Sequence, residues 1–298
     1  MSTINKTLTI GVEIEMNGIA RSDAAEIAAE FFGTDRHEYE GNGYDTYVAF
    51  DAQGRKWKFM RDSSINGPDG EKCELVTPIL HYSDIETLQE LVRRLRKAEA
   101  VSSEFEGCGI HVHIGAQDFT PQHLLNLVNI MASKQDLIYK ALRVSMCREH
   151  RYCKKYNKEF IEAVNKHKAA TLEDDWYNYL GNPWDRRTEH YNGSRYHGLN
   201  LHAYYTKGTV EFRLFNGTTH AGRIKAYIQF CLAMASQALA QKHVSPKATV
   251  TTNEKYTFRT WLLRMGLIGE EYATCRKFLL ENLSGDIAFK NGRPSHAA

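Results

Sequence analysis

The stretch Gly11-Val12-Glu13-Ile14-Glu15 alternates apolar and acidic residues near the start of the chain. Successive side chains of a β-strand point to opposite faces, so Glu13 and Glu15 share one face and the aliphatic residues share the other. Three later stretches carry acids, histidines or an arginine in a similar alternation, at residues 73–78, 109–115 and 209–213. Together they predict a sheet with an apolar back that packs on helices and a charged front that faces a cleft.

The bulk composition is that of an ordinary globular protein. The 298 residues are 42% hydrophobic and carry a formal net charge of +2, which gives no case for a nucleic-acid partner or an acidic membrane surface. No apolar run approaches the roughly 20 residues that span a bilayer, and the first residues show no signal-peptide pattern. The six cysteines lack framework spacing and fit reduced thiols. We therefore expect a cytoplasmic protein with no membrane partner.

Hydrophobic periodicity and capping residues predict helices and strands along most of the chain. Ser22 is expected to cap a helix that ends near Gly33. Ser83 and Glu86 form the pattern of a capping box, at the start of a helix that runs to about Ala100. The other predicted elements are strands at 7–16, two in 37–61, 109–115, 197–205 and 208–215, the last two joined as a hairpin, and helices from 120, at 221–240 and two in 255–283.

These elements predict an α+β fold, in which an antiparallel or mixed sheet has helices on one side and an open polar face on the other. We find no internal repeat, low-complexity linker or change of composition that would divide the chain. We therefore expect one domain over residues 1–285, with a strand-rich core at about 7–217 and C-terminal helices at 220–283. Residues 286–298 are predicted to be a flexible tail.

If the four motif strands lie in one sheet, their front gathers an acidic cluster. It comprises Glu13, Glu15, Glu74 and Glu211, with Asp62 as a further candidate. Uncompensated carboxylates repel one another and raise their own pKa values, and a bound cation removes that penalty. Oxygen-rich sites that include an imidazole suit Mg²⁺ or Mn²⁺. Arg213 adds a planar fork for phosphate, so the set indicates phosphoryl transfer, in which a protein mainly positions groups and neutralises charge.

The motifs resemble, in the same order, those of the glutamine-synthetase-like carboxylate–amine ligases. They are Gly11-x-Glu13-x-Glu15, Glu74-Leu-Val-Thr-Pro78, Gly109-Ile-His111-Val-His113 and Glu211-Phe-Arg213. They are most similar to the branch of small amidoligases related to glutamate–cysteine ligase. The resemblance covers residues 8–217 and implies a glutamine-synthetase-like catalytic fold with a curved, mostly antiparallel sheet. It also implies an ATP-dependent ligase that joins a carboxylate substrate to an amine substrate through an acyl phosphate.

The resemblance implies two groups of metal ligands for Mg²⁺ or Mn²⁺. The metal nearer the acceptor substrate would be held by Glu15, Glu74 and Asp62. The metal that bridges the ATP phosphates would be held by Glu13, His111 and Glu211.

The resemblance also implies residues that act on phosphate. His113 would contact a phosphate of ATP, and Arg213 would stabilise the γ-phosphoryl group during transfer. Arg195 matches a further basic residue that grips phosphate or substrate. Glu74, Arg195 and Arg213 are thus the expected catalytic residues, and His113, Arg195 and Arg213 the expected nucleotide-binding ones.

Two other classes of protein stay open. A metal-dependent amide hydrolase also uses His-x-His on a strand, but it predicts a barrel of repeated strand–helix units. A non-catalytic nucleotide-binding protein of the same fold would bind ATP and release no ADP. The sequence leaves open the oligomeric state and whether the substrates are amino acids, peptides or modified macromolecules.

Residues 145–195 show no clear period. Within them, the segment 148–158 is basic and interleaved with aromatic residues. Such a segment can grip a polyanion, or nucleotide phosphates if it folds over the cleft. We expect it to be a plain surface segment.

Overall fold

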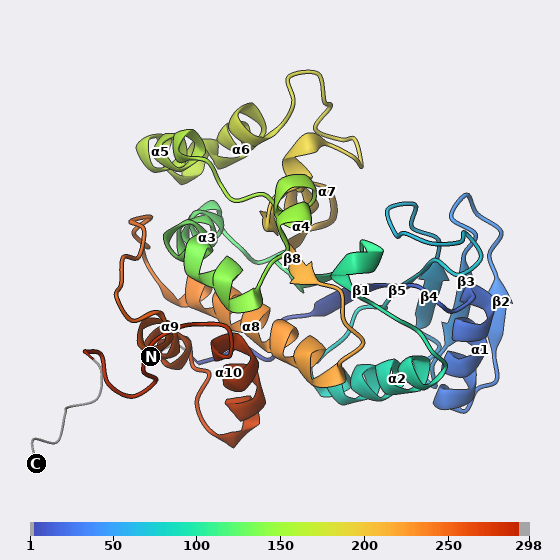
Figure 1. Cartoon of the computed structure of the whole chain (residues 1–298). Helices are drawn as coiled ribbons and strands as arrows, with labels where there is room; N and C mark the ends of the chain where they lie inside the picture. The colour runs from blue at the N-terminus through green and yellow to red at the C-terminus, as the bar shows by residue number, and fades with distance from the viewer. Residues whose placement is uncertain (1–2, 292–298) are drawn as a thin grey trace, which may run out of the picture.

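The computed structural model describes residues 3–291, which form an open eight-stranded sheet flanked by helices (Figure 1). The strand order is β2-β3-β4-β5-β1-β6-β8-β7, and each pair of neighbours is antiparallel. The strands are β1 (Ile10–Met16), β2 (His37–Tyr39), β3 (Tyr47–Phe50), β4 (Lys56–Met60), β5 (Cys73–Val76), β6 (Gly109–Gly115), β7 (Leu199–Asn200) and β8 (Thr209–Asn216). This confirms the predicted open antiparallel sheet with helices, and it differs from the barrel that the hydrolase alternative requires.

Helices cover the apolar face of the sheet. α1 contacts β3 and β4, α8 contacts β6, α3 contacts β8, and α2 packs against α1 and α8. Figure 1 shows α1 and α2 below the β2 side of the sheet, with α8 continuing toward α3, α9 and α10. The helices are α1 (Arg21–Phe32), α2 (Ile85–Lys97), α3 (Pro121–Leu142), α4 (Met146–Arg151), α5 (Lys158–His167), α6 (Leu172–Leu180), α7 (His202–Lys207), α8 (Ala221–Ala240), α9 (Glu254–Arg264) and α10 (Ala273–Leu280).

The core consists of the aliphatic residues that alternate with the polar ones on the central strands. Val12, Ile14 and Val112 are buried completely or almost completely in one apolar cluster that also includes α3 and α8. α8 is buried nearly all round and has the predicted bounds, because its apolar residues leave no polar stripe. Its burial holds the central strands from behind, so their polar side chains are left on the other face.

Two predicted helix starts are wrong. α1 begins at Arg21 with Ala20 at the N-cap, so Ser22 lies inside the helix; its end at Gly33 is confirmed. The capping box before α2 is formed by His81 and Asp84 in place of Ser83 and Glu86, and α2 ends at Lys97. Asp84 accepts from the His81 backbone N–H at 2.8 Å and also binds Arg55. Arg55 lies just before β4, far from Asp84 in the sequence. A pattern of neighbouring residues therefore gives no sign of this ion pair.

Two strand predictions need correction. Residues 37–61 contain three strands, β2, β3 and β4, where two were expected. The predicted strand 197–205 ends after β7, because Asn200 Oδ1 accepts from the His202 backbone N–H at 2.8 Å and the chain turns into α7. β7 and β8 still pair antiparallel, and Gly208 joins α7 to β8 with a φ of +74°. The connection is therefore a helical turn and not a hairpin.

Helices α3, α9 and α10 agree with their sequence signals, whereas α4, α5 and α6 lie in residues 145–195, where no helix was predicted. Thr120 caps α3, with Pro121 at its first position, and α9 and α10 occupy the region where two helices were expected. None of the helices within residues 3–291 has the length and apolar character that crossing a membrane requires. Of the tail predicted at 286–298, residues 292–298 lie outside the described part; within it, Asn253 Nδ2 donates to the Phe289 carbonyl at 2.9 Å.

Candidate functional site

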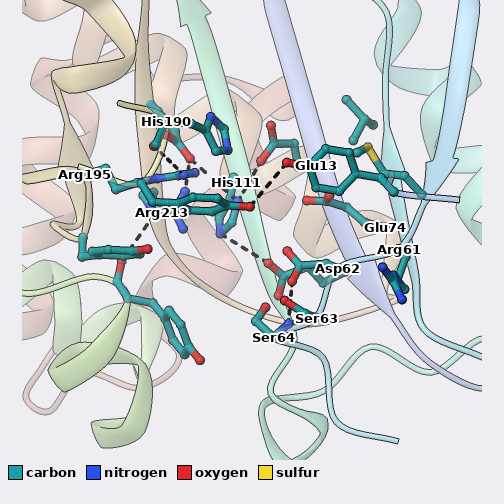
Figure 2. Close-up of a pocket in the computed structure, with 18 of the residues that line it drawn as sticks. Glu13, Arg61, Asp62, Ser63, Ser64, Glu74, His111, His190, Arg195 and Arg213 are labelled. Atoms are coloured by element: carbon teal, nitrogen blue, oxygen red, sulfur yellow. Dashed lines mark hydrogen bonds and ion pairs between the residues drawn. The ribbon is translucent and has the colours of Figure 1, made fainter. Parts of the chain in front are cut away.

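Strand pairing brings the polar residues of the four motifs together on one face of the sheet. β1 lies between β5 and β6, and β8 lies beyond β6. Three pairs of residues are opposite one another in the register: Glu15 and Glu74, Glu13 and His111, and Glu211 and His113. Opposite residues of neighbouring strands have their side chains on the same face. The sheet therefore gathers four carboxylates and two imidazoles into one patch, part of which Figure 2 shows.

A β-bulge positions the arginine of the last motif. Ile110 pairs with Phe215 but Val112 pairs with Phe212, so β8 carries one extra residue beside His111. The bulge lets Phe215 join the apolar face, where its ring stacks on Tyr227 of α8 at 4.3 Å between centroids. Arg213 stays on the polar face, and its Nη1 donates to Glu211 Oε1 at 2.5 Å.

A second arginine lies beneath the carboxylates. Arg148 of α4 is buried, with Nη1 4.0 Å from Glu15 Oε2, and its Nη2 donates to the Arg213 carbonyl at 3.0 Å. Gly109 makes room for it, because a Cβ there would lie 2.1 Å from the guanidinium. The Gly109 backbone N–H also donates to Glu15 Oε2 at 2.6 Å. Glycine at this position therefore supports both the carboxylate and the arginine.

The patch forms the floor of a pocket of about 500 Å³. Asp62, on the loop after β4, lies on the Glu74 side, as Figure 2 shows, and its carboxylate groups with those of Glu15 and Glu74. The opposite wall comes from the segment between α3 and β7, with Tyr152, His190, Tyr191, Arg195 and Tyr196. At the rim, Tyr44 and Tyr191 approach each other with 3.5 Å between their hydroxyl oxygens. Two distant parts of the chain thus meet across the mouth of the pocket.

One half of the site is electrically compensated. Burial by itself would raise the pKa of Glu211, but Arg213 and then His113 outweigh it and bring that pKa to about 2. Burial also opposes the ionisation of Glu13, and His113 and His111 outweigh it, so its pKa lies well below the usual value. These carboxylates are ionised because cations and hydrogen-bond donors surround them.

The other half is not compensated. Burial raises the pKa of Glu15 to about 7; Arg148 opposes this shift and the charge of Asp62 adds to it. Burial, followed by the charges of Glu13 and Glu15, raises the pKa of Glu74 well above its usual value. Within residues 3–291 the Glu74 carboxylate accepts no hydrogen bond from any side chain or backbone group. A bound cation would relieve this repulsion.

The donor atoms fit a chain of cation positions. Three groups have possible ligand atoms within 4.8 Å of one another, and Glu13 and Glu74 each belong to two of them. The groups are Glu15, Asp62 and Glu74; Glu13, Glu74 and His111; and Glu13, His113 and Glu211. The oxygen-rich composition suits hard divalent cations such as Mg²⁺ or Mn²⁺.

The histidines differ in how they face this chain of positions. His111 Nδ1 is 2.9 Å from Glu13 Oε2. His113 Nε2 is buried and has no hydrogen-bond partner among residues 3–291, although it lies 3.3 Å from Glu13 Oε1 and 3.7 Å from Glu211 Oε1. The other ring nitrogen of His113 is fixed by Thr209 Oγ1 at 3.1 Å. A buried ring nitrogen close to two carboxylates, with the other ring nitrogen held by a hydroxyl, is the arrangement expected of a metal ligand with a supporting hydrogen bond.

The basic residues of the pocket lie at two levels. Arg213 is buried in the floor, whereas Arg195 is half-buried in the wall, where its Nη1 donates to the His190 carbonyl at 2.9 Å. The two therefore approach the pocket from different elements, and both are drawn in Figure 2. All the predicted site residues line this single pocket; the roles assigned to them stay predictions.

Sequence reasoning missed Arg148 and its neighbours. The segment 148–158 was expected on the surface, but Arg148, Cys153 and Tyr156 are buried, and Arg148 and Tyr152 line the pocket. The prediction is wrong for these positions because β8 and the Gly109 position accept the arginine, and neither is near it in sequence. Lys58, Arg61 and Lys207 also line the pocket and were not singled out.

The pKa of Glu15 gives a prediction for stability. Its pKa in the folded protein is about 7, above the 4.5 of an ordinary glutamate, so the folded state holds the proton more tightly than the unfolded state does. The protonated carboxyl therefore adds to the free energy of unfolding at pH values below 4.5, and this contribution is lost as the pH rises through 7. The loss amounts to about 3 kcal/mol. In EDTA, the free energy of unfolding of Glu15→Gln relative to wild type should rise by that amount between pH 4.5 and pH 8. Urea unfolding of both proteins measures it, and a pH-independent difference would contradict it.

Comparison with known proteins finds one protein family whose model covers the residues of this pocket. The model of this family, described as "Putative amidoligase enzyme", matches residues 6–235, which include every residue of the acidic patch and both arginines of the predicted site. No curated protein matches the chain.

Proposed function

Because this chain belongs to the amidoligase family, we propose that it is an ATP-dependent carboxylate–amine ligase that forms an amide or isopeptide bond. The family name indicates an enzyme that makes carbon–nitrogen bonds from a carboxylate and an amine. The observation that carries the finer proposal is the convergence of five carboxylates, three imidazoles and four arginines on one pocket. The same proposal includes a glutamine-synthetase-like fold for the sheet and its helices.

The proposed cofactor is Mg²⁺ or Mn²⁺, which would supply positive charge to the phosphates of ATP. We propose that Glu15, Asp62 and Glu74 hold one ion. Glu13 and Glu211 would hold another together with an imidazole; the resemblance assigns this place to His111, whereas the spacing of ligand atoms favours His113. The unpartnered Nε2 of His113 and the raised pKa values of Glu15 and Glu74 support the presence of cations.

The proposed phosphate end of the pocket is the side lined by Arg213 and Arg195. Arg213 would stabilise the γ-phosphoryl group, because its guanidinium is already held by Glu211 and needs no reorganisation during transfer. Arg195 would grip phosphate or substrate from the wall. Lys207, which lines the same pocket, could add a further positive charge.

The proposed reaction has two steps. A carboxylate oxygen of the donor attacks the γ-phosphorus, the bond from that phosphorus to the bridging oxygen breaks, and ADP leaves. The amine then attacks the acyl carbon, the bond to the phosphate oxygen breaks, and the amide remains after loss of a proton. Water competes with the amine at the second step, so a covered pocket favours the amide. The Tyr44 and Tyr191 rim lies where such a cover would be needed.

The test is ADP release from ATP with Mg²⁺ or Mn²⁺, screened across pairs of carboxylic acids with amino acids, amines and peptides. Mass spectrometry of the product should show the mass of the donor plus the amine less one water. Hydrolysis of amides without any nucleotide would favour the hydrolase instead. Binding of ATP with no ADP released for any pair would favour a non-catalytic binding protein.

Arg213→Lys should lower ADP release by about 100-fold or more, as loss of one preorganised donor does in other active sites. A lysine ammonium is a point charge and cannot replace a guanidinium that binds Glu211 and a phosphate together. Arg93→Lys, on the exposed face of α2, is the matched control and should leave the rate unchanged. Comparable rates for Arg213→Lys and wild type would remove Arg213 from the reaction.

A further inference from the structure

We propose that a second pocket, on the helical side of the molecule, binds a phosphorylated small molecule of about nucleotide size. It has a volume of about 1170 Å³ and shares no residue with the candidate active site. Its walls are α3, the end of α8, α9 and the segment that joins α8 to α9. Figure 1 shows these elements grouped together, far from the β2 edge of the sheet.

The lining of this pocket has charges of one sign only. It contains no aspartate or glutamate, and its basic residues are Lys134, His243, Lys247, Arg264 and Lys290. The whole chain has 38 Lys and Arg against 36 Asp and Glu, so an average surface would mix the two signs. No ion pair within residues 3–291 includes any of the five, whereas Lys140 on the same helix pairs with Glu254 at 2.6 Å. The positive charges therefore have no internal neutralising partner.

Lys134 is the half-buried member of this group, and the other four basic residues are exposed. Its ammonium donates to Thr249 Oγ1 at 2.7 Å and lies 5.8 Å from the centre of the Trp261 ring. Burial, and after it the charge of Arg264, lowers the pKa of Lys134. An anion beside Lys134 and Arg264 would remove this repulsion and supply the counter-charge that the protein does not.

The walls are held in place before any ligand binds. The segment 241–249 is neither helix nor strand, yet polar side chains of α3 fix it along its length. Asn126 Nδ2 donates to the Gln241 carbonyl at 2.5 Å, and Asn129 Nδ2 to the Val244 carbonyl at 3.0 Å. Further along, the Thr249 backbone N–H donates to the Ser133 carbonyl at 2.9 Å. A fixed wall loses little entropy on binding, which favours a binding site over a mobile surface loop.

The size and lining of the pocket indicate the class of ligand. Ligand sites commonly measure roughly 300–1,000 Å³, so this space is far larger than one orthophosphate needs. Basic groups from four different segments would contact successive phosphates or several phosphoryl groups of one molecule. The hydroxyl groups of Ser245 and Thr257 line the same space, together with the exposed edge of Trp261; the hydroxyl of Thr260 donates to the Tyr256 carbonyl. A polyphosphate chain with or without a nucleoside fits this set of groups.

The test is calorimetric titration of the full chain with tripolyphosphate in EDTA. The candidate active site also carries lysines and arginines, so loss of affinity in variants of the second pocket, and not binding alone, assigns the site. We expect 1:1 binding that weakens about tenfold in Lys134→Gln and in Arg264→Gln, as loss of one charged hydrogen bond predicts. Lys140→Gln is the matched control, because that lysine is already neutralised by Glu254. ATP in EDTA is the second arm: equal affinity assigns recognition to the phosphates, and tighter binding adds a nucleoside contact.

Tryptophan fluorescence provides a local readout. Binding should change the emission of Trp261, and Trp261→Phe should remove that change while the heat of binding persists. The absence of binding, or equal binding by wild type and a folded Lys134→Gln, Arg264→Gln double variant, would overturn the proposal. Arg213→Lys, which is expected to lose ADP release, should bind tripolyphosphate like wild type, so this site and the ligase activity can fail separately.

Discussion

Glu211→Gln is expected to abolish ADP release and to destabilise the protein by about 3–5 kcal/mol in EDTA. The buried carboxylate accepts from Arg213 Nη1 at 2.5 Å and from Asn200 Nδ2 at 2.6 Å. The neutral amide would leave Arg213 in the floor of the pocket without its counter-charge. Urea unfolding measures the stability, and the ADP assay with Mg²⁺ or Mn²⁺ measures the activity.

The control is Glu90→Gln on the exposed face of α2, where Glu90 pairs with Arg93 at 3.0 Å. An exposed pair contributes about 0–1 kcal/mol, so this variant should unfold close to wild type. Wild-type stability of Glu211→Gln would mean that Arg213 is satisfied by other groups. Wild-type ADP release would contradict the place of Glu211 in the site.

Glu74→Gln is expected to abolish ADP release with the opposite effect on stability. In the metal-free protein Glu74 is a buried carboxylate beside Glu13 and Glu15, and its pKa is raised well above the usual value. Replacing it with a neutral amide of the same shape removes that repulsion, which should stabilise the protein by about 1–2 kcal/mol. The gain should be larger at pH 8 than at pH 5, because the wild-type carboxyl is protonated and neutral at low pH.

Metal titration distinguishes two effects of Glu74→Gln, the loss of a metal ligand and the relief of repulsion between carboxylates. Mn²⁺ should raise the melting temperature of wild type at pH 8 by ligand linkage, and Glu74→Gln should lose most of that increase. Glu74→Gln and Glu211→Gln make the same chemical change on β5 and β8, so opposite shifts in stability isolate the effect of the local charges. A loss of metal-free stability in Glu74→Gln would contradict the repulsion that we infer.

Local patterns predicted the central strands and their two faces. Glu13 and Glu15 alternate with Val12 and Ile14, and the aliphatic residues are buried while the acids line the pocket, because the side-chain period of a strand is two residues in any context. Thr120 likewise signalled the start of α3 through a hydrogen bond within one turn. The helix α8 was predicted for a related reason, since a segment that is apolar all round is buried wherever it lies.

Local patterns failed where a distant contact decides the outcome. The capping box before α2 depends on Asp84 and Arg55, and the end of β7 depends on Asn200, whose Nδ2 donates to Glu211 Oε2 of β8 at 2.6 Å. Strict alternation would also place Phe215 on the polar face beside Arg213. The bulge turns Phe215 to the apolar face, where its ring stacks on Tyr227. Each case trades a local preference for a contact that exists only after the chain has folded.

The residues of the acidic patch could be predicted from the sequence, because polar and apolar residues alternate along the four strands that carry them. Which acids are compensated could not be predicted, since Glu211 is bound by Arg213 and Asn200, while the charges of Glu13 and Glu15 dominate around Glu74. The burial of Arg148 next to Glu15 also required the folded arrangement, as it depends on the space at Gly109. Alternation is a property of one strand, whereas charge balance depends on the distances between strands, which only packing and register set.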